Sequence, residues 1–450
     1  MNENNLKSIS PIDGRYSKIS NKISSYFSEY ALIKYRVYVE IEYFKALCDI
    51  PLKQLASISS SDKKKISAIA SKFSLENANR IKKIEQKINH DVKAVEYFIK
   101  EEFDDLGLKN YKEFIHFGLT SQDINNTATP LMLKFCLKNI LLPSLGDVLK
   151  LLKNKSDDFI NISMIARTHG QAASPTTFGK EINVFYERIK NQLNLLYKIP
   201  NNGKFGGASG NLNAHYVSYP SIDWDNFSNK FLERLGLERS KPTTQIEHYD
   251  NMAAIFHNLS RINTILIDFC KDIWHYISIN YLIQKVNKKE IGSSAMPHKI
   301  NPIDFENAEG NLMLANSLYT FFSEKLPISR LQRDLTDSTI SRNIGLPLAY
   351  SKIAFDSIIK GINKLDIGKE TIEKDLNNNW AVVSEAIQTI LRREKISNPY
   401  ELLKDLTRNN DKITKESISK FINDLPINQK IKDELSKIAP KNYIGNSNKK

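Results

Sequence analysis

The sequence predicts an all-α protein of three helical domains built around a central bundle of long helices. Two observations support this prediction. Apolar side chains recur at steps of three and four residues over long stretches of the chain, which is the helical period. Alternating strand patterns bounded by turns are scarce, and the chain contains no GxGxxG or Walker-type phosphate loop.

Four segments are expected to form the long helices: 176–199, 250–286, 304–326 and 348–365. The clearest is 250–286, which contains neither glycine nor proline. Its stripe follows the helical steps through Ile255, Leu259, Ile262, Leu266, Phe269, Ile273, Tyr276 and Asn280. Pro200 is expected to stop the helix over 176–199. Each helix is far longer than the average of about three turns, so each needs long partners, within one chain or across an oligomer.

The chain of 450 residues exceeds what one hydrophobic core usually serves, so two or three domains are expected. Residues 1–110 hold shorter helices. Residues 111–365 hold the long helices and the motifs that carry chemistry. Residues 366–450 return to short segments rich in charge.

The net charge of +13 (64 basic minus 51 acidic residues) is spread along the chain. We find no arginine-rich arm, zinc-finger spacing or basic stripe interleaved with aromatics, so we expect a solvated lysine-rich surface and no nucleic-acid partner.

Cys48, Cys136 and Cys270 lie far apart without a CxxC motif, which favours free thiols in a reducing compartment. Without an apolar leader or a run of ~18 apolar residues, we expect a cytoplasmic protein with no membrane partner.

The first polar patch is 120–127, which reads Thr-Ser-Gln-Asp-Ile-Asn-Asn-Thr and follows His116 and Gly118. Small hydroxyls and amides suit hydrogen bonding to a carboxylate or a phosphate. Thr120 or Ser121 would serve equally well as the N-cap of a helix with a polar first turn. The residues alone leave both interpretations open.

The second patch is 167–171, Arg-Thr-His-Gly-Gln, in which His169 stands beside a glycine. An isolated histidine is more often structural than catalytic. Its polar neighbours and Pro175 favour a rigid loop that opens the helix over 176–199. His116 and His215 also lie near polar patches, and their roles stay open.

The third patch is 292–302, Gly-Ser-Ser-Ala-Met-Pro-His-Lys-Ile-Asn-Pro. Packing gives no reason for a glycine-hinged loop that holds two hydroxyls and a lysine between prolines. A serine is a poor base unless a nearby cation and backbone donors stabilise its alkoxide. Lys299 supplies that cation, so Ser293 and Lys299 together suit proton abstraction next to an anion.

This loop resembles the signature of the fumarase/aspartase superfamily. Three further stretches resemble the adenylosuccinate lyase family within it, in its longer bacterial form: Ser-Pro-Ile-Asp-Gly-Arg-Tyr at 10–16, Asn-His-Asp-Val-Lys-Ala-Val-Glu-Tyr at 89–97, and Gln-Arg-Asp-Leu-Thr-Asp-Ser-Thr at 332–339. The resemblance extends from about residue 8 to the Tyr-Ile-Gly at 443–445, which is nearly the whole chain.

The resemblance implies catalytic roles for five residues. Ser293 is the expected general base and His169 the expected general acid. Glu306 is the expected carboxylate that orients the histidine. Lys299 and Asn301 are expected to stabilise the aci-carboxylate that forms when the proton leaves.

The resemblance also implies a substrate pocket rich in hydrogen-bond donors. Thr120, Ser121 and Gln245 are expected to hold the succinyl carboxylates and neighbouring polar atoms. The nucleotide and its phosphate are expected to contact Arg15, Tyr16, His90, Asp91, Arg333, Ser338 and Arg342, with Asn89, Thr339, Ile340 and Ser341 completing the substrate-binding set. Arginine forks suit such anions.

The implied reaction releases fumarate from adenylosuccinate, giving AMP, and from the succinyl-carboxamide ribotide SAICAR, giving AICAR. It requires no metal and no cofactor, and the family assembles as a homotetramer with shared active sites. Alternatives are another lyase of the superfamily, such as argininosuccinate lyase, or an inactive helical scaffold. Ala172, Ser209 and the pair His248-Tyr249 depart from the family pattern, which bears on substrate affinity more than on reaction type.

Overall fold

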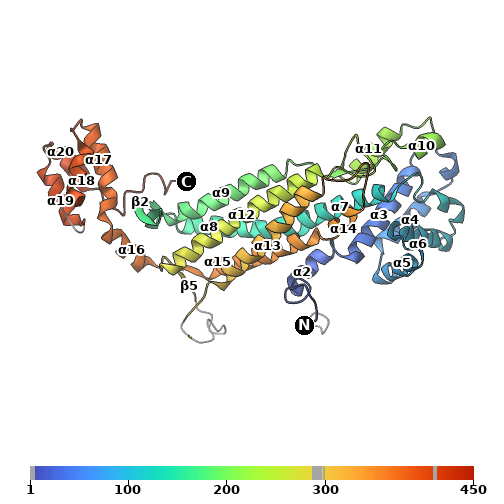
Figure 1. Cartoon of the computed structure of the whole chain (residues 1–450), viewed down its shortest axis with the longest axis horizontal. Helices are drawn as coiled ribbons and strands as arrows, with labels where there is room; N and C mark the ends of the chain where they lie inside the picture. Colours follow the sequence, from blue (N-terminus) through green and yellow to red (C-terminus); the bar gives the residue numbers. More distant parts are fainter. Residues whose placement is uncertain (1–5, 286–295, 297–298, 409–412, 450) are drawn as a thin grey trace. The chain divides into compact units, whose positions relative to one another are not determined.

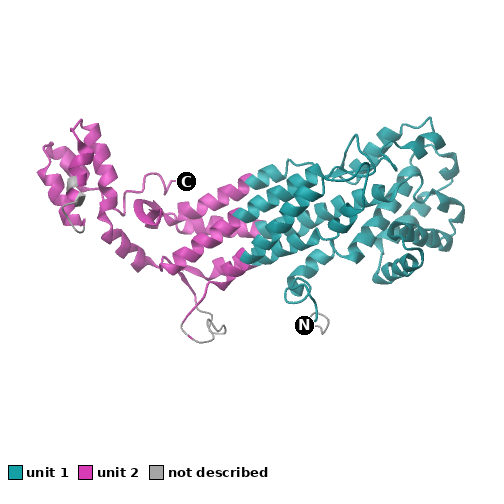
Figure 2. Ribbon diagram, viewed as in Figure 1, with its two compact units in different colours: residues 1–145, 192–264, 310–356 teal, residues 146–191, 265–309, 357–450 magenta. Residues whose placement is uncertain are grey.

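The computed structural model describes residues 6–285, 296, 299–408 and 413–449, and these form mainly helices joined by turns and loops, with three two-stranded ladders (Figure 1). The predicted all-α fold class is confirmed. The chain divides into two compact units (Figure 2): unit 1 comprises residues 1–145, 192–264 and 310–356, and unit 2 comprises residues 146–191, 265–309 and 357–450. The three-domain division stays a prediction. Among the helices of the described residues, none has the length and apolar character that a membrane span requires.

Unit 1 is built mainly from short and medium helices. These are α2 (Ser17–Ser24), α3 (Glu29–Leu47), η1 (Lys53–Leu55), α4 (Ser60–Ser71), α5 (Leu75–Ile88), α6 (Asp91–Asp105), η2 (Lys109–Phe114), α7 (Ser121–Cys136), η3 (Leu137–Leu141), α10 (Asn213–Ser218), α11 (Trp224–Arg234) and α14 (Thr336–Ser341). A short parallel ladder joins β3 (Asn202–Gly203) to β4 (Glu238–Arg239). Five long helices supply residues to both units: α8 (Leu142–Asp158), α9 (Phe178–Leu196), α12 (Asp250–Ser278), α13 (Ile303–Lys325) and α15 (Gly345–Lys364).

Unit 2 also contains the C-terminal helices α16 (Lys369–Asn378), η4 (Trp380–Val383), α17 (Ser384–Arg393), α18 (Pro399–Arg408), α19 (Lys415–Asp424) and α20 (Gln429–Ser436). Two antiparallel ladders complete it. One pairs β1 (Ser163–Thr168) with β2 (Gln171–Thr177), and the other pairs β5 (Leu282–Gln284) with β6 (Leu365–Ile367).

The long helices pack through the apolar stripes that the sequence shows. In unit 1 the ring of Phe256 on α12 lies 5.7 Å from the rings of Tyr319 and Phe322 on α13. In unit 2 the ring of Phe269 on α12 lies 5.4 Å from Phe185 on α9 and 6.3 Å from Phe305 on α13. The helices predicted over 176–199, 304–326 and 348–365 are confirmed as α9, α13 and α15, with ends that shift by a few residues.

The helix predicted over 250–286 is shorter than expected. α12 ends at Ser278, because Asn280 adopts a left-handed conformation with a φ of 59° and Tyr281 N donates to Tyr276 O at 2.9 Å. This is the usual geometry of a helix C-terminus, in which asparagine replaces the commoner glycine. Asn280 is exposed and does not belong to the apolar stripe, so that part of the prediction was wrong.

The loop predicted over 167–175, before the helix over 176–199, is a β-hairpin. β1 and β2 pair from Ser163↔Thr177 to Thr168↔Gln171, and α9 begins only at Phe178. The prediction of a loop that opens the helix was therefore wrong. The two strands lack the alternation of polar and apolar residues that would have indicated strands in the sequence. Their side chains instead bind residues of the C-terminal helices.

His215 belongs to the aromatic core of unit 1. Its ring is fully buried and lies 4.8 Å from the ring of Trp224. The Tyr43 hydroxyl donates to Phe117 O at 2.7 Å and lies 2.9 Å from His215 Nε2, so Nε2 carries the ring proton and donates to that hydroxyl. Burial lowers the pKa of His215 to about 4. This histidine, whose role the sequence left open, is a neutral core residue.

The neutral His215 predicts a pH-dependent stability. Its pKa in the folded chain lies below the usual value of about 6.5, so the unfolded chain takes up the proton first as the pH falls. The contribution of the neutral ring to the free energy of unfolding is complete above about pH 6.5 and is lost progressively as the pH falls toward about 4. Between pH 7.5 and 5.5, we expect the free energy of unfolding, measured by thermal melts, to fall by about 1 kcal/mol more in the wild type than in His215→Gln. Equal losses in the two proteins would contradict this.

Candidate active site

A pocket of about 430 Å³ in unit 1 gathers residues from four separate segments. The segments are the end of α5, the start of α6, the start of α7 and the stretch 333–342 that includes α14. The lining residues are Glu85, Asn89, His90, Asp91, Ser121, Asn125, Arg333, Leu335, Ser338, Thr339 and Arg342. All but Leu335 carry polar or charged side chains, so the pocket suits a polar ligand rather than an apolar one.

The two-residue turn between α5 and α6 presents Asn89 and His90. Asn89 caps α5 in the left-handed conformation, with a φ of 53°, which asparagine tolerates better than most residues. His90 caps α6, because its Nδ1 accepts a hydrogen bond from Lys93 N at 3.1 Å. Since Nδ1 is an acceptor, the ring proton of His90 lies on Nε2. The ring is therefore fixed with a donor available for a ligand.

Asp91 joins the pocket to the core of unit 1. Its Oδ2 accepts from Nη2 of Arg36, at 2.7 Å, and from Nη2 of Arg342, at 3.0 Å. Arg36 is buried on α3, and its Nε also donates to Asn125 Oδ1 at 2.8 Å. Burial alone would raise the pKa of Asp91, but the charge and hydrogen bond of Arg36 outweigh it and lower that pKa. Asp91 thus stays ionised and holds Arg342, which also binds Glu29 at 2.7 Å, at the pocket.

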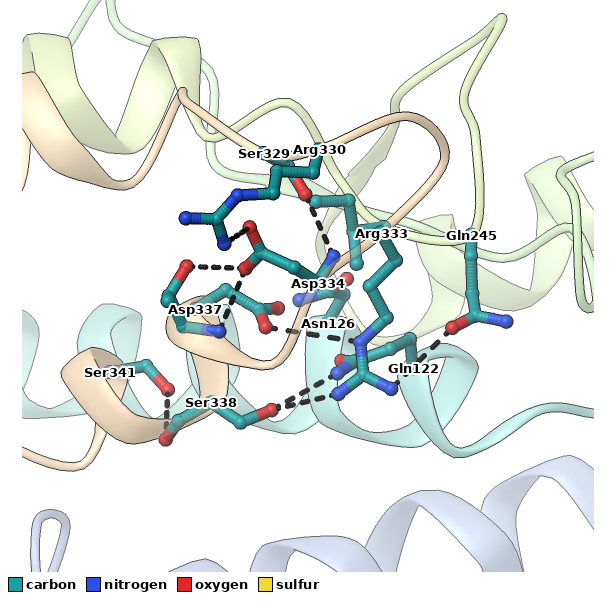
Figure 3. Close-up of polar contacts among 12 residues, drawn as sticks. Gln122, Asn126, Gln245, Ser329, Arg330, Arg333, Asp334, Asp337, Ser338 and Ser341 are labelled. Atoms are coloured by element: carbon teal, nitrogen blue, oxygen red, sulfur yellow. Dashed lines mark hydrogen bonds and ion pairs between the residues drawn. The ribbon is translucent and has the colours of Figure 1, made fainter.

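Arg333 forms the second cationic point of the pocket (Figure 3). Its Nη2 donates to Ser338 Oγ at 3.1 Å, and its Nη1 lies 3.5 Å from Gln245 Oε1. With the amide oxygen of Gln122 facing the guanidinium, this oxygen accepts from Nε at 3.2 Å and from Nη2 at 2.6 Å. Three uncharged acceptors therefore orient the Arg333 guanidinium. Asp337 partly neutralises its charge, because Asp337 Oδ1 lies 3.9 Å from Arg333 Nε.

A buried layer under Arg333 holds Asp337. The Tyr249 hydroxyl donates to Asp337 Oδ2 at 3.0 Å and accepts from Asn126 Nδ2 at 2.5 Å. Burial, followed by the charge of Asp337, raises the pKa of Tyr249 well above its usual range, so the hydroxyl remains a donor. Tyr249, one of the departures from the family pattern, therefore has a defined hydrogen-bonding role here.

Asp123 and Lys204 fix the start of α7. Both side chains are fully buried, and Lys204 Nζ lies 2.7 Å from Asp123 Oδ1. Asp123 also accepts from the backbone amides of Thr120, at 2.9 Å, and Gly206, at 2.8 Å. A buried charge pair with its remaining sites satisfied holds a defined geometry. Thr120 is the N-cap of α7, as one interpretation of this patch expected, and Ser121 lines the pocket. Its hydrogen bonding to a carboxylate or a phosphate stays a prediction.

His116, whose role the sequence also left open, is paired with a buried carboxylate. Its Nδ1 lies 2.6 Å from Oε1 of Glu40 on α3. Burial opposes a charged ring, but the charge and hydrogen bond of Glu40 outweigh it and raise the pKa of His116. The ring of His116 is thus held by Glu40 a few residues before the α7 start.

His169 stands at the tip of the β1–β2 hairpin in unit 2. His169 and Gly170 form the two-residue turn, with φ values of 53° and 77°. Two positive φ values identify a turn of type I′, which matches the twist of a hairpin. A residue other than glycine is uncommon at a positive φ, so the fold holds His169 there under local strain. The side chain is exposed and makes no hydrogen bond to any described residue of the chain.

The remaining predicted catalytic residues belong to the segment before α13 and its first turn. Ser293 lies outside the described residues. Lys299 is exposed, and its backbone N donates to Met296 O at 3.0 Å. Asn301 is half-buried. Glu306 accepts from Trp274 Nε1 at 3.1 Å, and its predicted contact with His169 is not made within the described residues of one chain.

The structure thus separates the predicted residues into two groups. Asn89, His90, Asp91, Ser121, Arg333, Ser338, Thr339 and Arg342 line one pocket in unit 1, with Thr120 and Gln245 beside it. Arg15, Tyr16, Ile340 and Ser341 belong to the same unit but do not line that pocket. His169, Lys299, Asn301 and Glu306 fall in unit 2.

The sequence interpretation missed several supporting residues. Gln122 and Asn125 lie inside the polar patch at 120–127 and could have been taken from it. An arginine inside the apolar run of α3 was a signal for Arg36. Asp337 and Tyr249 carried no local signal, because their roles depend on contact between distant segments.

Two family models match the chain. The model described as lyase matches residues 14–316, and the model described as adenylosuccinate lyase C-terminal matches residues 329–444. The adenylosuccinate lyase of Dictyostelium discoideum is 56% identical, over 98% of this chain and 97% of its own length. The adenylosuccinate lyase of Escherichia coli strain K12 is 44% identical, over 99% of this chain and 98% of its own length.

Solved structures share the fold at low identity. A fumarate lyase from Mesorhizobium sp. BNC1 superimposes with a TM-score of 0.74 at 18% identity, over 95% of this chain and 96% of that chain. The β-carboxy-cis,cis-muconate cycloisomerase of Acinetobacter calcoaceticus sp. ADP1 gives 0.69 at 16% identity, over 95% of each chain. These likenesses establish the fold alone.

The fixed orientation of the Arg333 guanidinium predicts that replacing it with lysine weakens anion binding selectively. Arg333→Lys keeps the charge but cannot reproduce the planar fork that contacts Ser338, Gln122 and Gln245. We expect the Kd for AMP, measured by titration calorimetry, to rise about 10-fold. Arg330→Lys is the matched control, because Arg330 is an exposed neighbour that pairs only with Asp334 among the described residues. Equal Kd values for the two variants would contradict the assignment of Arg333 to the binding pocket.

Proposed function

The chain belongs to the adenylosuccinate lyase family of the fumarase/aspartase superfamily, and we propose that it cleaves adenylosuccinate to AMP and fumarate and SAICAR to AICAR and fumarate. One structural observation supports the phosphorylated substrate: the unit 1 pocket holds two guanidinium groups, of Arg333 and Arg342, next to His90 and Ser121. A phosphate and several hydroxyls match this set of donors.

Proton removal starts the proposed reaction. The Ser293 alkoxide takes the proton from the carbon next to a carboxylate of the succinyl group and becomes a neutral hydroxyl. The electron pair left behind moves into that carboxylate and gives a doubly charged aci-carboxylate. Lys299 and Asn301 stabilise this charge where it develops, which is the largest contribution such a site makes.

Cleavage of the carbon–nitrogen bond completes the elimination. The electron pair returns from the aci-carboxylate to form the carbon–carbon double bond of fumarate, and the bond to nitrogen breaks. His169 donates a proton to the departing nitrogen, so the product leaves as a neutral amine. Base and acid stand on opposite faces of the substrate, which accounts for two motifs far apart in the sequence. The route uses only side-chain acids and bases, and the predicted absence of a metal and of a cofactor stays a prediction.

We also propose that the active sites are shared within a homotetramer. His169 is exposed on a hairpin tip and has no hydrogen-bond partner among the described residues of its own chain, while Glu306, its expected carboxylate, contacts Trp274. The long helices also expose apolar side chains that a neighbouring chain would cover, including Leu195 on α9, Trp274 on α12, and Met313 and Phe321 on α13. The absence of a nucleic-acid partner and a cytoplasmic location stay predictions.

The alternatives make different demands on the site. Argininosuccinate carries no phosphate, so an argininosuccinate lyase would have no use for the arginine pair of the pocket. An inactive scaffold would have no reason to keep Ser293, His169 and Lys299 together.

Substrate assays separate these possibilities. We expect purified protein to release fumarate, measured by chromatography, from adenylosuccinate and SAICAR but not from argininosuccinate. Ser293→Ala should lower kcat about 10³-fold, because a general base typically contributes that much. Ser317→Ala is its control, because Ser317 is an exposed serine on α13 whose hydroxyl donates to Leu314 O, and it should retain kcat within about twofold. Fumarate from argininosuccinate alone, or full turnover by Ser293→Ala, would overturn the proposal.

A further inference from the structure

The hairpin that carries His169 is bound along its whole length by the C-terminal part of unit 2. At its open end, Ser163 Oγ donates to Lys441 O at 2.7 Å and Thr177 Oγ1 donates to Ser447 O at 3.0 Å. Nearer the tip, one carboxylate binds each strand. An isolated two-stranded hairpin is at best marginally stable in water, so these contacts decide where its tip lies.

Asp375 on α16 binds the first strand. Its Oδ2 accepts from Arg167 Nη2 at 2.6 Å and from the hydroxyl of Tyr281, and its Oδ1 accepts from Asn379 Nδ2 at 2.8 Å. Burial, followed by the hydrogen bond to Asp375, raises the pKa of Tyr281, which keeps its hydroxyl a donor. Both carboxylate oxygens of Asp375 are therefore used. Arg167 pairs with Ala172 one rung before the turn, so Asp375 acts close to His169 along the strand.

Glu385 on α17 binds the second strand. It accepts a hydrogen bond from the hydroxyl of Ser174 and another from the Tyr443 hydroxyl at 2.9 Å. These two hydrogen bonds lower the pKa of Glu385, so it remains ionised at neutral pH. Tyr443 belongs to the C-terminal arm, defined here as residues 441–447. The arm thus reaches the hairpin through Glu385 as well as through its own backbone.

We propose that Asp375, Glu385 and Tyr443 are positioning residues that set the placement of His169 for proton donation. This inference rests on the proposed function, in which His169 is the general acid. His169 has no hydrogen-bond partner among the described residues of its own chain, so its place depends on the hairpin backbone and on the strained turn at the tip. The hairpin backbone in turn depends on these two carboxylates and the arm.

Positioning and simple stabilisation predict different results. A misplaced acid slows the breaking of the carbon–nitrogen bond, while the unit 1 pocket keeps its affinity for the nucleotide. A loss of folding would instead lower the melting temperature and nucleotide affinity together. The quantities to compare are therefore kcat, the Kd for AMP and the melting temperature of each variant.

The main variant is Asp375→Asn, which keeps the shape of the side chain and removes the charge that binds Arg167. We expect kcat to fall about 10-fold, since a small misplacement of a reacting group has effects of this order or larger. The Kd for AMP should stay within about twofold of the wild-type value. Tyr443→Phe removes one hydroxyl with little risk to folding and should lower kcat about threefold.

Glu434→Gln is the matched control. Glu434 binds Arg393 through two hydrogen bonds, of 2.9 and 2.6 Å, within the same C-terminal helices and makes no contact with the hairpin among the described residues. It should keep kcat within about twofold of wild type. A similar fall in kcat for Glu434→Gln and Asp375→Asn would show a general loss of stability and overturn the proposal.

Two further measurements separate the inference from the function on which it rests. If the wild type releases no fumarate from adenylosuccinate, the proposed function fails. If the wild type is active and His169→Ala is not, but Asp375→Asn and Tyr443→Phe keep wild-type kcat, only the positioning role fails. If Asp375→Asn does not fold, the Tyr443→Phe result decides.

Discussion

The substrate pocket depends on one carboxylate that two arginines share. Asp91 Oδ2 lies between the buried Arg36 and the pocket residue Arg342, at 2.7 and 3.0 Å. Arg36 also holds Asn125, so a single guanidinium in the core ties the α6 start to the α7 start. A pocket that binds anions must fix its cations before the ligand arrives, because reorganising them during binding or reaction costs free energy. The contact from the buried Arg36 to Asp91 is part of the folded chain, so Asp91 holds the Arg342 cation in place before a ligand binds.

Recognition and chemistry are built from different parts of the chain. The polar pocket belongs to unit 1, where helix ends present Asn89, His90 and Ser121. The proposed acid belongs to unit 2, on a strained hairpin tip, and the proposed anion holders Lys299 and Asn301 lie just before α13 in the same unit. Helix ends and short turns anchored on long helices hold a side chain more precisely than free loops do. This division explains why the loop at 292–302 alone indicates the superfamily. The substrate can be inferred only when the arginine pocket is considered with that loop.

Much of the fold was predictable because long apolar stripes need no tertiary information. α9, α13 and α15 follow them to within a few residues. The early end of α12 was not predictable from the stripe, since a single left-handed residue, Asn280, determines it. The β1–β2 hairpin was missed because its partners, Asp375 and Glu385, lie some 200 residues further along the chain.

The site follows the same pattern. Among the predicted pocket residues, Ser121 came from a polar patch that packing could not explain, whereas the others came from the resemblance to the family. The supporting residues were harder, because a buried Asp337 or Tyr249 resembles any other core residue until the segments at 245–249 and 333–338 meet. The resemblance placed roles on Ser293 and His169, but it gave no view of how the fold holds the histidine.

Ser293 and His169 are proposed to act on one substrate molecule in a site shared between chains. The direct test mixes two inactive variants, Ser293→Ala and His169→Ala, dissociates them and allows them to reassemble. If the two residues come from different chains, random mixing in equal amounts restores about a quarter of wild-type turnover, because about one site in four receives both intact residues. If both residues of a site come from one chain, the mixture stays as inactive as its components, and that result would contradict the shared site.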